Sequence, residues 1–188
     1  MALTDLRHYI RIYDDDLTQS FCQRMIESFH SLSRHHRAKG RGYRRGLEDS
    51  VWTELDVTRL SDEAFRSFFR ARIDAALGRY NRDVGLKIEV PNSAKTAELV
   101  IKRYRAGGGE KFQQHFDSIH EVANRYFVLL WYLNDVAEGG ETVFPQIDVK
   151  VAARRGRLLV FPPYWMFQHA GLPPLSNEKF ILSTYLLF

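Results

Sequence analysis

The sequence predicts a mainly β protein with N-terminal helices (α+β): a double-stranded β-helix, or jelly roll, with helices packed on one outer sheet. Two early segments have apolar residues at helical spacing, whereas from about Thr96 short runs rich in Val, Ile, Leu, Tyr and Phe alternate with turn residues. The length of 188 residues is that of a single domain, 1–188. Within it, residues 1–95 are expected to form largely helical support with a basic loop, and residues 96–188 the jelly-roll core.

Two helices are expected in the first half. Asp14, Asp15 and Asp16 offer caps for the first, in which Phe21, Met25, Ile26 and Phe29 share one face. Ser61 is the candidate cap of the second, whose apolar positions are Phe65, Phe68, Phe69, Ile73, Ala76 and Leu77, with Gly78 near its end. Each helix has one apolar face, so each must cover another part of the molecule.

The second half is expected to contain six to eight strands. Six of them are readable from composition and from the Gly, Pro and Asn residues between them: 98–104, 126–134, 141–144, 148–152, 157–161 and 179–188. The mouth of the resulting barrel is a natural place for a small-molecule site.

Composition narrows the class of protein. A single cysteine, Cys22, excludes an intrachain disulfide framework and fits a reducing compartment. No secretion signal is recognisable at the N-terminus, and no apolar run approaches membrane-spanning length. We therefore expect a cytoplasmic protein with no membrane contact. The sequence does not predict its oligomeric state.

Charge is concentrated in one stretch, Arg34 to Arg45, which contains six Arg and Lys residues and two histidines. Such a stretch is usually a solvated loop. Alternatively, it is a surface for phosphate or acidic partners, or a lid over a substrate.

The most informative motif is His115-Phe116-Asp117, followed by His169 and Lys179. In a strand, His115 and Asp117 would point to the same face. Two imidazoles and one carboxylate on one face of a metal ion are the way in which non-haem Fe(II) oxygenases bind iron. His169 is the best candidate for the third ligand, because the other histidines lie in the N-terminal half or, like His120, in the loop that follows. We also expect His169 to share strand parity with Trp165 and Phe167, which would turn it inward. Its alternative role is a hydrogen-bonded core histidine.

Lys179 opens a strongly apolar final strand and would share its inward face with Ile181 and Ser183. A lysine at such a position usually reaches back to solvent. If its ammonium is buried, it needs an anionic partner, and the distal carboxylate of a 2-oxoacid would supply one.

Further motifs carry a resemblance. Asn124-Arg125, residues 130–135 (LWYLND), residues 138–145 (EGGETVFP), residues 156–162 (GRLLVFP) and His169-Ala170-Gly171 resemble the prolyl 4-hydroxylase branch of the 2-oxoglutarate/Fe(II)-dependent dioxygenase superfamily. The resemblance covers roughly Glu98 to Phe188.

That resemblance implies roles for individual residues. His115, Asp117 and His169 would be the iron ligands, and Lys179 would anchor 2-oxoglutarate. Tyr104 and Tyr132 fit tyrosines that reach the co-substrate in relatives, although either is equally an ordinary barrel aromatic. One position departs from the pattern, because many relatives have threonine where this chain has Val128.

The implied reaction hydroxylates an unactivated C–H bond with Fe(II), 2-oxoglutarate and O2, and releases succinate and CO2. Ascorbate is the candidate reductant. A prolyl or other residue in a protein or peptide is the first candidate substrate, and a free amino acid or small metabolite is the alternative. Nucleic-acid demethylation is disfavoured, because the repair relatives typically anchor 2-oxoglutarate with arginine. Outside the enzymes, the rival is a non-catalytic jelly-roll binding module.

Overall fold

The computed structural model describes residues 5–40 and 46–188. The α-helices are α1 (Gln19–Ser31) and α2 (Glu63–Val84). Short 3-10 helices span Leu6–Tyr9, Ser33–His35, His120–Val122, Pro145–Ile147 and Trp165–Phe167. The strands are β1 (Arg11–Tyr13), β2 (Arg37–Gly40), β3 (Val51–Asp56), β4 (Val100–Tyr104), β5 (Phe112–His115), β6 (Arg125–Tyr132), β7 (Thr142–Phe144), β8 (Val149–Val151), β9 (Leu158–Phe161), β10 (His169–Gly171) and β11 (Lys179–Leu187).

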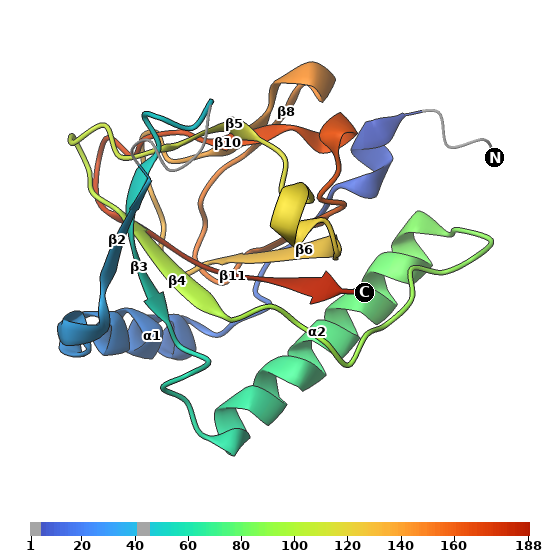
Figure 1. Cartoon of the computed structure of the whole chain (residues 1–188), viewed down its shortest axis with the longest axis horizontal. Helices are drawn as coiled ribbons and strands as arrows, with labels where there is room; N and C mark the ends of the chain where they lie inside the picture. Colours follow the sequence, from blue (N-terminus) through green and yellow to red (C-terminus); the bar gives the residue numbers. More distant parts are fainter. Residues whose placement is uncertain (1–4, 41–45) are drawn as a thin grey trace.

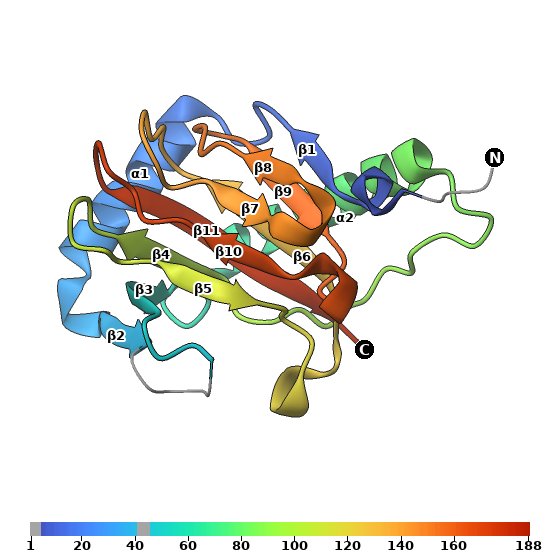
Figure 2. The same cartoon turned by 90° about the horizontal axis from the view of Figure 1, so that it is seen from above.

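The strands form two antiparallel sheets that lie face to face. The larger sheet has the order β1-β9-β6-β11-β4-β3-β2, and the smaller has the order β5-β10-β7-β8. Both helices lie on one face of the larger sheet, and the smaller sheet covers the opposite face (Figures 1 and 2). The prediction of a mostly β chain with two helices on one sheet is therefore confirmed.

Strand β6 shows how the sequence builds these three layers. Phe127, Leu129 and Trp131 belong to the apolar core under the helices. Val128, Leu130 and Tyr132 alternate with them and belong to the second core, between the sheets. Because side chains in a strand alternate between faces, a run that is apolar at every position is buried on both sides.

The helix boundaries differ from those predicted. Thr18 caps α1 by accepting a hydrogen bond from the Phe21 amide, and Asp62, not Ser61, caps α2. Helix α2 also continues past Gly78 to Val84, and it ends where Gly85 adopts a left-handed conformation (φ 65°). Tyr80, Asn81 and Val84 follow Gly78 and are buried. Because these side chains pack in the core, the helix continues past Gly78.

The aspartates proposed as caps have tertiary partners instead. Asp14 pairs with Arg157, the residue before β9, with 2.6 Å between the Arg157 Nε and an Asp14 carboxylate oxygen. The buried Asp16 accepts a hydrogen bond from Trp131 Nε1 at 2.7 Å and pairs with Arg79 of α2. Asp16 thus links β6 of the larger sheet to α2.

The N-terminal half supplies more than helices. It contributes β1 at one edge of the larger sheet and β3 and β2 at the other. Strands β1 and β2 are short, and β2 is largely polar, so they lack the apolar alternation by which strands are recognised. Part of the basic stretch therefore forms β2, while Arg41, Arg44 and Arg45 lie outside the described residues. Of the helices in the described ranges, none is long and apolar enough to cross a bilayer.

Candidate metal and co-substrate site

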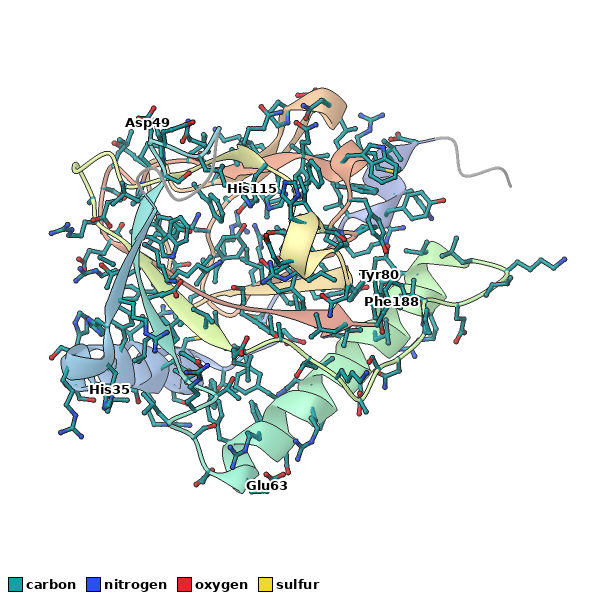
Figure 3. All side chains as sticks on the ribbon, in the orientation of Figure 1. His35, Asp49, Glu63, Tyr80, His115 and Phe188 are labelled. Carbon is teal, nitrogen blue, oxygen red and sulfur yellow. The ribbon has the colours of Figure 1, made fainter. Side chains whose placement is uncertain are left out.

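All of the predicted site residues except Tyr132 line one pocket between the two sheets. His115, at the end of β5, lies on the opposite side of the larger sheet from Glu63 and Tyr80 of α2 (Figure 3). The pocket is lined by Lys102, Tyr104, Phe112, His115, Asp117, Val128, Leu130, Thr142, His169, Gly171, Lys179, Ile181, Ser183 and Tyr185.

His115, Asp117 and His169 form one compact group, in which the candidate ligand atoms all lie within 4.8 Å of one another. His115 Nε2 is 3.5 Å from one Asp117 carboxylate oxygen, and His169 Nε2 is 3.4 Å from the other. The two histidines are brought together by strand pairing, because His169 of β10 is opposite His115 of β5. Residues 54 positions apart thereby become neighbours.

Backbone carbonyls orient both imidazoles. His115 Nδ1 is 2.7 Å from the Gln113 carbonyl oxygen, and His169 Nδ1 is 3.1 Å from that of Phe167. A hydrogen bond from Nδ1–H to a carbonyl leaves the Nε2 lone pair directed at the centre of the group, as is usual for metal-binding histidines.

The local structure around these side chains differs in two ways from the expectation. Strand β5 ends at His115, so Asp117 lies just beyond it, and its amide donates to the Pro163 carbonyl at 3.0 Å. Trp165 and Phe167 belong to a 3-10 helix that precedes β10, not to a strand. In consequence Trp165 is 64 % exposed, while Phe167 is buried in the core between the sheets.

The charges of the group suit a divalent cation. Burial by itself raises the pKa of Asp117, but the adjacent His169 and His115 outweigh it and keep the pKa of this carboxyl well below its usual range. Burial, together with His115, lowers the pKa of His169 to about 4. Near neutral pH the carboxylate is therefore ionised and His169 is neutral, which are the forms that bind metal.

Tyr185 of β11 supports the carboxylate, and the sequence analysis missed it. Its hydroxyl donates a hydrogen bond to an Asp117 oxygen at 3.0 Å. The alternation of side chains in a strand could have indicated this residue, because Tyr185 lies on the same face of the strand as Lys179, Ile181 and Ser183. A hydrogen bond of this kind fixes the orientation of a metal ligand.

Lys179 is buried at one end of the pocket, 2 % exposed, with Ile181 and Ser183 farther along the same face. Its ammonium lies 5.3 Å from the centre of the Tyr104 ring and 5.8 Å from that of Tyr132. Among the described residues it has no hydrogen bond or ion pair. Burial lowers the pKa of Lys179 to about 7, with Glu141 acting in the opposite direction. A buried cation without a partner calls for an anionic ligand.

The two tyrosines are placed differently. Tyr104 lies opposite Lys179 on the neighbouring strand and lines the pocket. Tyr132 is fully buried and is not part of the lining, and its hydroxyl donates to Thr142 Oγ1 at 2.7 Å. Thr142 does line the pocket, so it supplies a hydroxyl there, while Val128 lines the pocket without one.

The residues present fit an Fe(II) ion with a 2-oxoacid beside it. Two imidazoles and one carboxylate are the donor set of non-haem Fe(II) oxygenases. The buried ammonium of Lys179 and the Thr142 hydroxyl lie in the same pocket and suit a carboxylate.

Comparison with known proteins gives a consistent result. Residues 99–187 match the family model of the 2OG-Fe(II) oxygenase superfamily. The human prolyl 4-hydroxylase subunit alpha-1 is 25 % identical over 171 residues, which cover 79 % of this chain and 30 % of that protein. The chain thus spans about 30 % of the length of the curated relatives matched first.

Two solved structures share the fold. The viral collagen prolyl hydroxylase of Paramecium bursaria Chlorella virus-1, in a 2OG complex, has a TM-score of 0.65 at 19 % identity, covering 95 % of each chain. A prolyl hydroxylase from Trichoplax adhaerens, in complex with a peptide fragment of the hypoxia inducible factor oxygen degradation domain, has a TM-score of 0.72 at 16 % identity. That match covers 96 % of this chain and 84 % of the other.

Proposed function

We propose that this chain is a 2-oxoglutarate- and Fe(II)-dependent dioxygenase similar to the prolyl 4-hydroxylases, and that it hydroxylates a prolyl or other residue of a protein or peptide. The observation that carries the proposal is the His115, Asp117 and His169 group with the buried Lys179 in the same pocket. We also propose that the two facing sheets form a double-stranded β-helix.

Each side chain has a distinct task in this proposal. His115, Asp117 and His169 hold Fe(II), which supplies oxidative C–H chemistry with O2 when it is bound. Lys179 binds the distal carboxylate of 2-oxoglutarate. Many relatives have a threonine at the position of Val128, and in this chain the Thr142 hydroxyl takes the role of that threonine. Tyr104 contributes its ring and hydroxyl beside Lys179. Ascorbate is the proposed external reductant.

Peptide substrates are favoured by the relatives, several of which are prolyl hydroxylases, one of them solved with a peptide. A free amino acid or small metabolite is the second candidate. It is favoured by the enclosed position of the metal group, where Asp117 and His169 are both 6 % exposed.

The first experiment tests the enzyme itself. Purified protein with Fe(II), 2-oxoglutarate and O2 should form succinate, and mass spectrometry of candidate prolyl peptides and amino acids should show a gain of one oxygen. Asp117→Ala should lose both iron binding and succinate formation, whereas the exposed carboxylate variant Glu89→Ala should retain both. Succinate formation by Asp117→Ala at the wild-type rate would show that the metal group is assigned wrongly.

A further inference from the structure

Lys102 is a second lysine in the same pocket, and the site described above gives it no task. It lies two residues before Tyr104 on β4, so both side chains face the pocket. The two positions are about 7 Å apart along the strand. Its partner on β11 is Ile181, whereas the partner of Tyr104 is Lys179. The two lysines therefore occupy different positions along the pocket.

The ammonium of Lys102 lies between aromatic rings. It is 5.8 Å from the centre of the Trp52 ring and 5.7 Å from that of Phe112. Within the described ranges, Lys102 has no hydrogen bond and no ion pair. Aromatic faces attract a cation, but they leave its hydrogen-bond donors without acceptors.

The nearest carboxylates are already engaged. Glu54, opposite Lys102 on β3, accepts a hydrogen bond from Trp52 Nε1 at 3.1 Å and pairs with Lys39 at 3.6 Å. Asp117 accepts from Tyr185 and lies between the two histidines. Burial lowers the pKa of Lys102, and the charges of these two carboxylates oppose that effect.

Lys102 also lies on the metal side of the pocket. The Phe112 ring that lies 5.7 Å from its ammonium is stacked on the His115 imidazole, with 3.6 Å between the two ring centres. A second cation, Arg125 of β6, has its guanidinium 3.9 Å from the centre of the Tyr185 ring, which itself hydrogen-bonds to Asp117. Lys102 and Arg125 thus add positive charge near the metal group, at a position separate from Lys179.

We propose that Lys102 binds a carboxylate of the substrate, so that the preferred substrate of this enzyme is anionic close to the carbon that is hydroxylated. The proposal rests on the function proposed above and specifies the substrate class. A carboxylate would give the Lys102 ammonium the acceptor that the protein does not provide. Two sources offer this group: an acidic residue next to the target residue of a peptide, or the carboxylate of a free amino acid.

Binding to a protein that cannot turn over tests the proposal directly. Protein loaded with Mn(II) and 2-oxoglutarate is titrated by calorimetry with three matched pairs of ligands. The pairs are N-acetyl-Glu-Pro-amide with its Gln analogue, N-acetyl-Pro-Glu-amide with its Gln analogue, and proline with prolinamide. The first two pairs test a peptide source on either side of the target residue, and the third tests the free amino acid.

The expected result is that the carboxylate member of at least one pair binds at least about tenfold more tightly than its amide. Lys102→Met should remove this preference by weakening only the carboxylate member, and Lys102→Arg should retain it. Lys87→Met, which removes the charge of an exposed lysine, is the matched control and should bind like the wild type.

Three outcomes overturn the proposal. The first is equal binding, or no binding, of both members in all three pairs. The second is a preference that survives Lys102→Met. The third is a Lys102→Met protein that loses affinity for 2-oxoglutarate and keeps its selectivity, since Lys102 would then serve the co-substrate. Succinate formation by the wild type, measured separately, shows whether the proposed dioxygenase function stands in each case.

Discussion

Replacement of Lys179 by methionine should separate stability from function. The lysine is 2 % exposed and its pKa falls from 10.5 to about 7 on burial. At 1.36 kcal/mol for each pKa unit, this lowering corresponds to an unfavourable free energy of about 5 kcal/mol for the charged form in the ligand-free protein. Methionine has a similar length and needs no partner, so Lys179→Met should be more stable than the wild type without ligand.

The pH dependence of this gain follows from the direction of the shift. The pKa in the folded state is lower than in the unfolded state, so the penalty is fully present below about pH 7 and shrinks as the pH rises toward 10.5. Relaxation around the charge reduces the gain, and we expect a few kcal/mol in urea denaturation at pH 6.5. The difference between variant and wild type should narrow at pH 9.

Addition of 2-oxoglutarate should reduce this difference in stability between Lys179→Met and the wild type. At a hundred times its dissociation constant, a ligand stabilises the wild type by about 2.7 kcal/mol. Removing one partner of a buried charge pair costs about 2 to 5 kcal/mol, so Lys179→Met should bind 2-oxoglutarate at least about 25-fold more weakly. Lys87→Met, at an exposed position, is the control and should match the wild type in both measurements.

The reasoning is refuted if Lys179→Met is less stable than the wild type without 2-oxoglutarate at pH 6.5. It is equally refuted if 2-oxoglutarate stabilises the variant as much as the wild type. The first outcome would mean that Lys179 already has an anionic partner in the protein. The second would mean that the co-substrate carboxylate binds elsewhere.

Three further changes have defined expectations. The affinity of the Mn(II)-loaded wild type for 2-oxoglutarate should fall by up to about tenfold per pH unit above pH 7, because the Lys179 ammonium loses its proton. Lys179→Arg should abolish this pH dependence, since arginine stays protonated. Calorimetry at pH 6 to 9 measures both affinities, and a wild-type affinity that does not change with pH contradicts the role assigned to Lys179. Tyr185→Phe removes the hydrogen bond to Asp117 and should weaken Fe(II) binding by about tenfold in a competition titration with a chelator, while unaltered affinity would show that this hydroxyl does not hold the carboxylate. Trp131→Phe removes the Trp131 donor from Asp16, which keeps its pair with Arg79, and should cost about 1 to 3 kcal/mol in urea denaturation. The exposed Trp165→Phe should change stability by less than about 0.5 kcal/mol, and equal effects of the two substitutions would mean that the Trp131 hydrogen bond to Asp16 contributes nothing.

Much of the second half could be predicted because its strands carry a strong local signal. The six strands read from the sequence all occur, with ends shifted by up to two residues. The first half was less predictable. Strands β1 and β2 are only three and four residues long, and they exist because the edges of the larger sheet offer partners to them. Their own sequences carry too few apolar residues to reveal them.

The caps show the same limit. Asp14 and Asp16 are good cap residues by type, yet Arg157, Trp131 and Arg79 engage them from parts of the chain that are distant in sequence. Capping is a local preference of about 1 kcal/mol, and buried hydrogen bonds to charged groups outweigh it.

The sequence by itself determined which residues share a face. The parity of β11 places Lys179, Ile181 and Ser183 in the pocket, because the alternation of side chains in a strand is a local property. Only the tertiary structure decided which faces meet. The pairing of β5 with β10 places His169 opposite His115. The residues before His169, Trp165–Phe167, form a 3-10 helix and not the strand that was predicted. The surroundings of Lys102 likewise depend on Trp52 of β3 and Phe112 of β5, whose approach follows from the packing of two sheets.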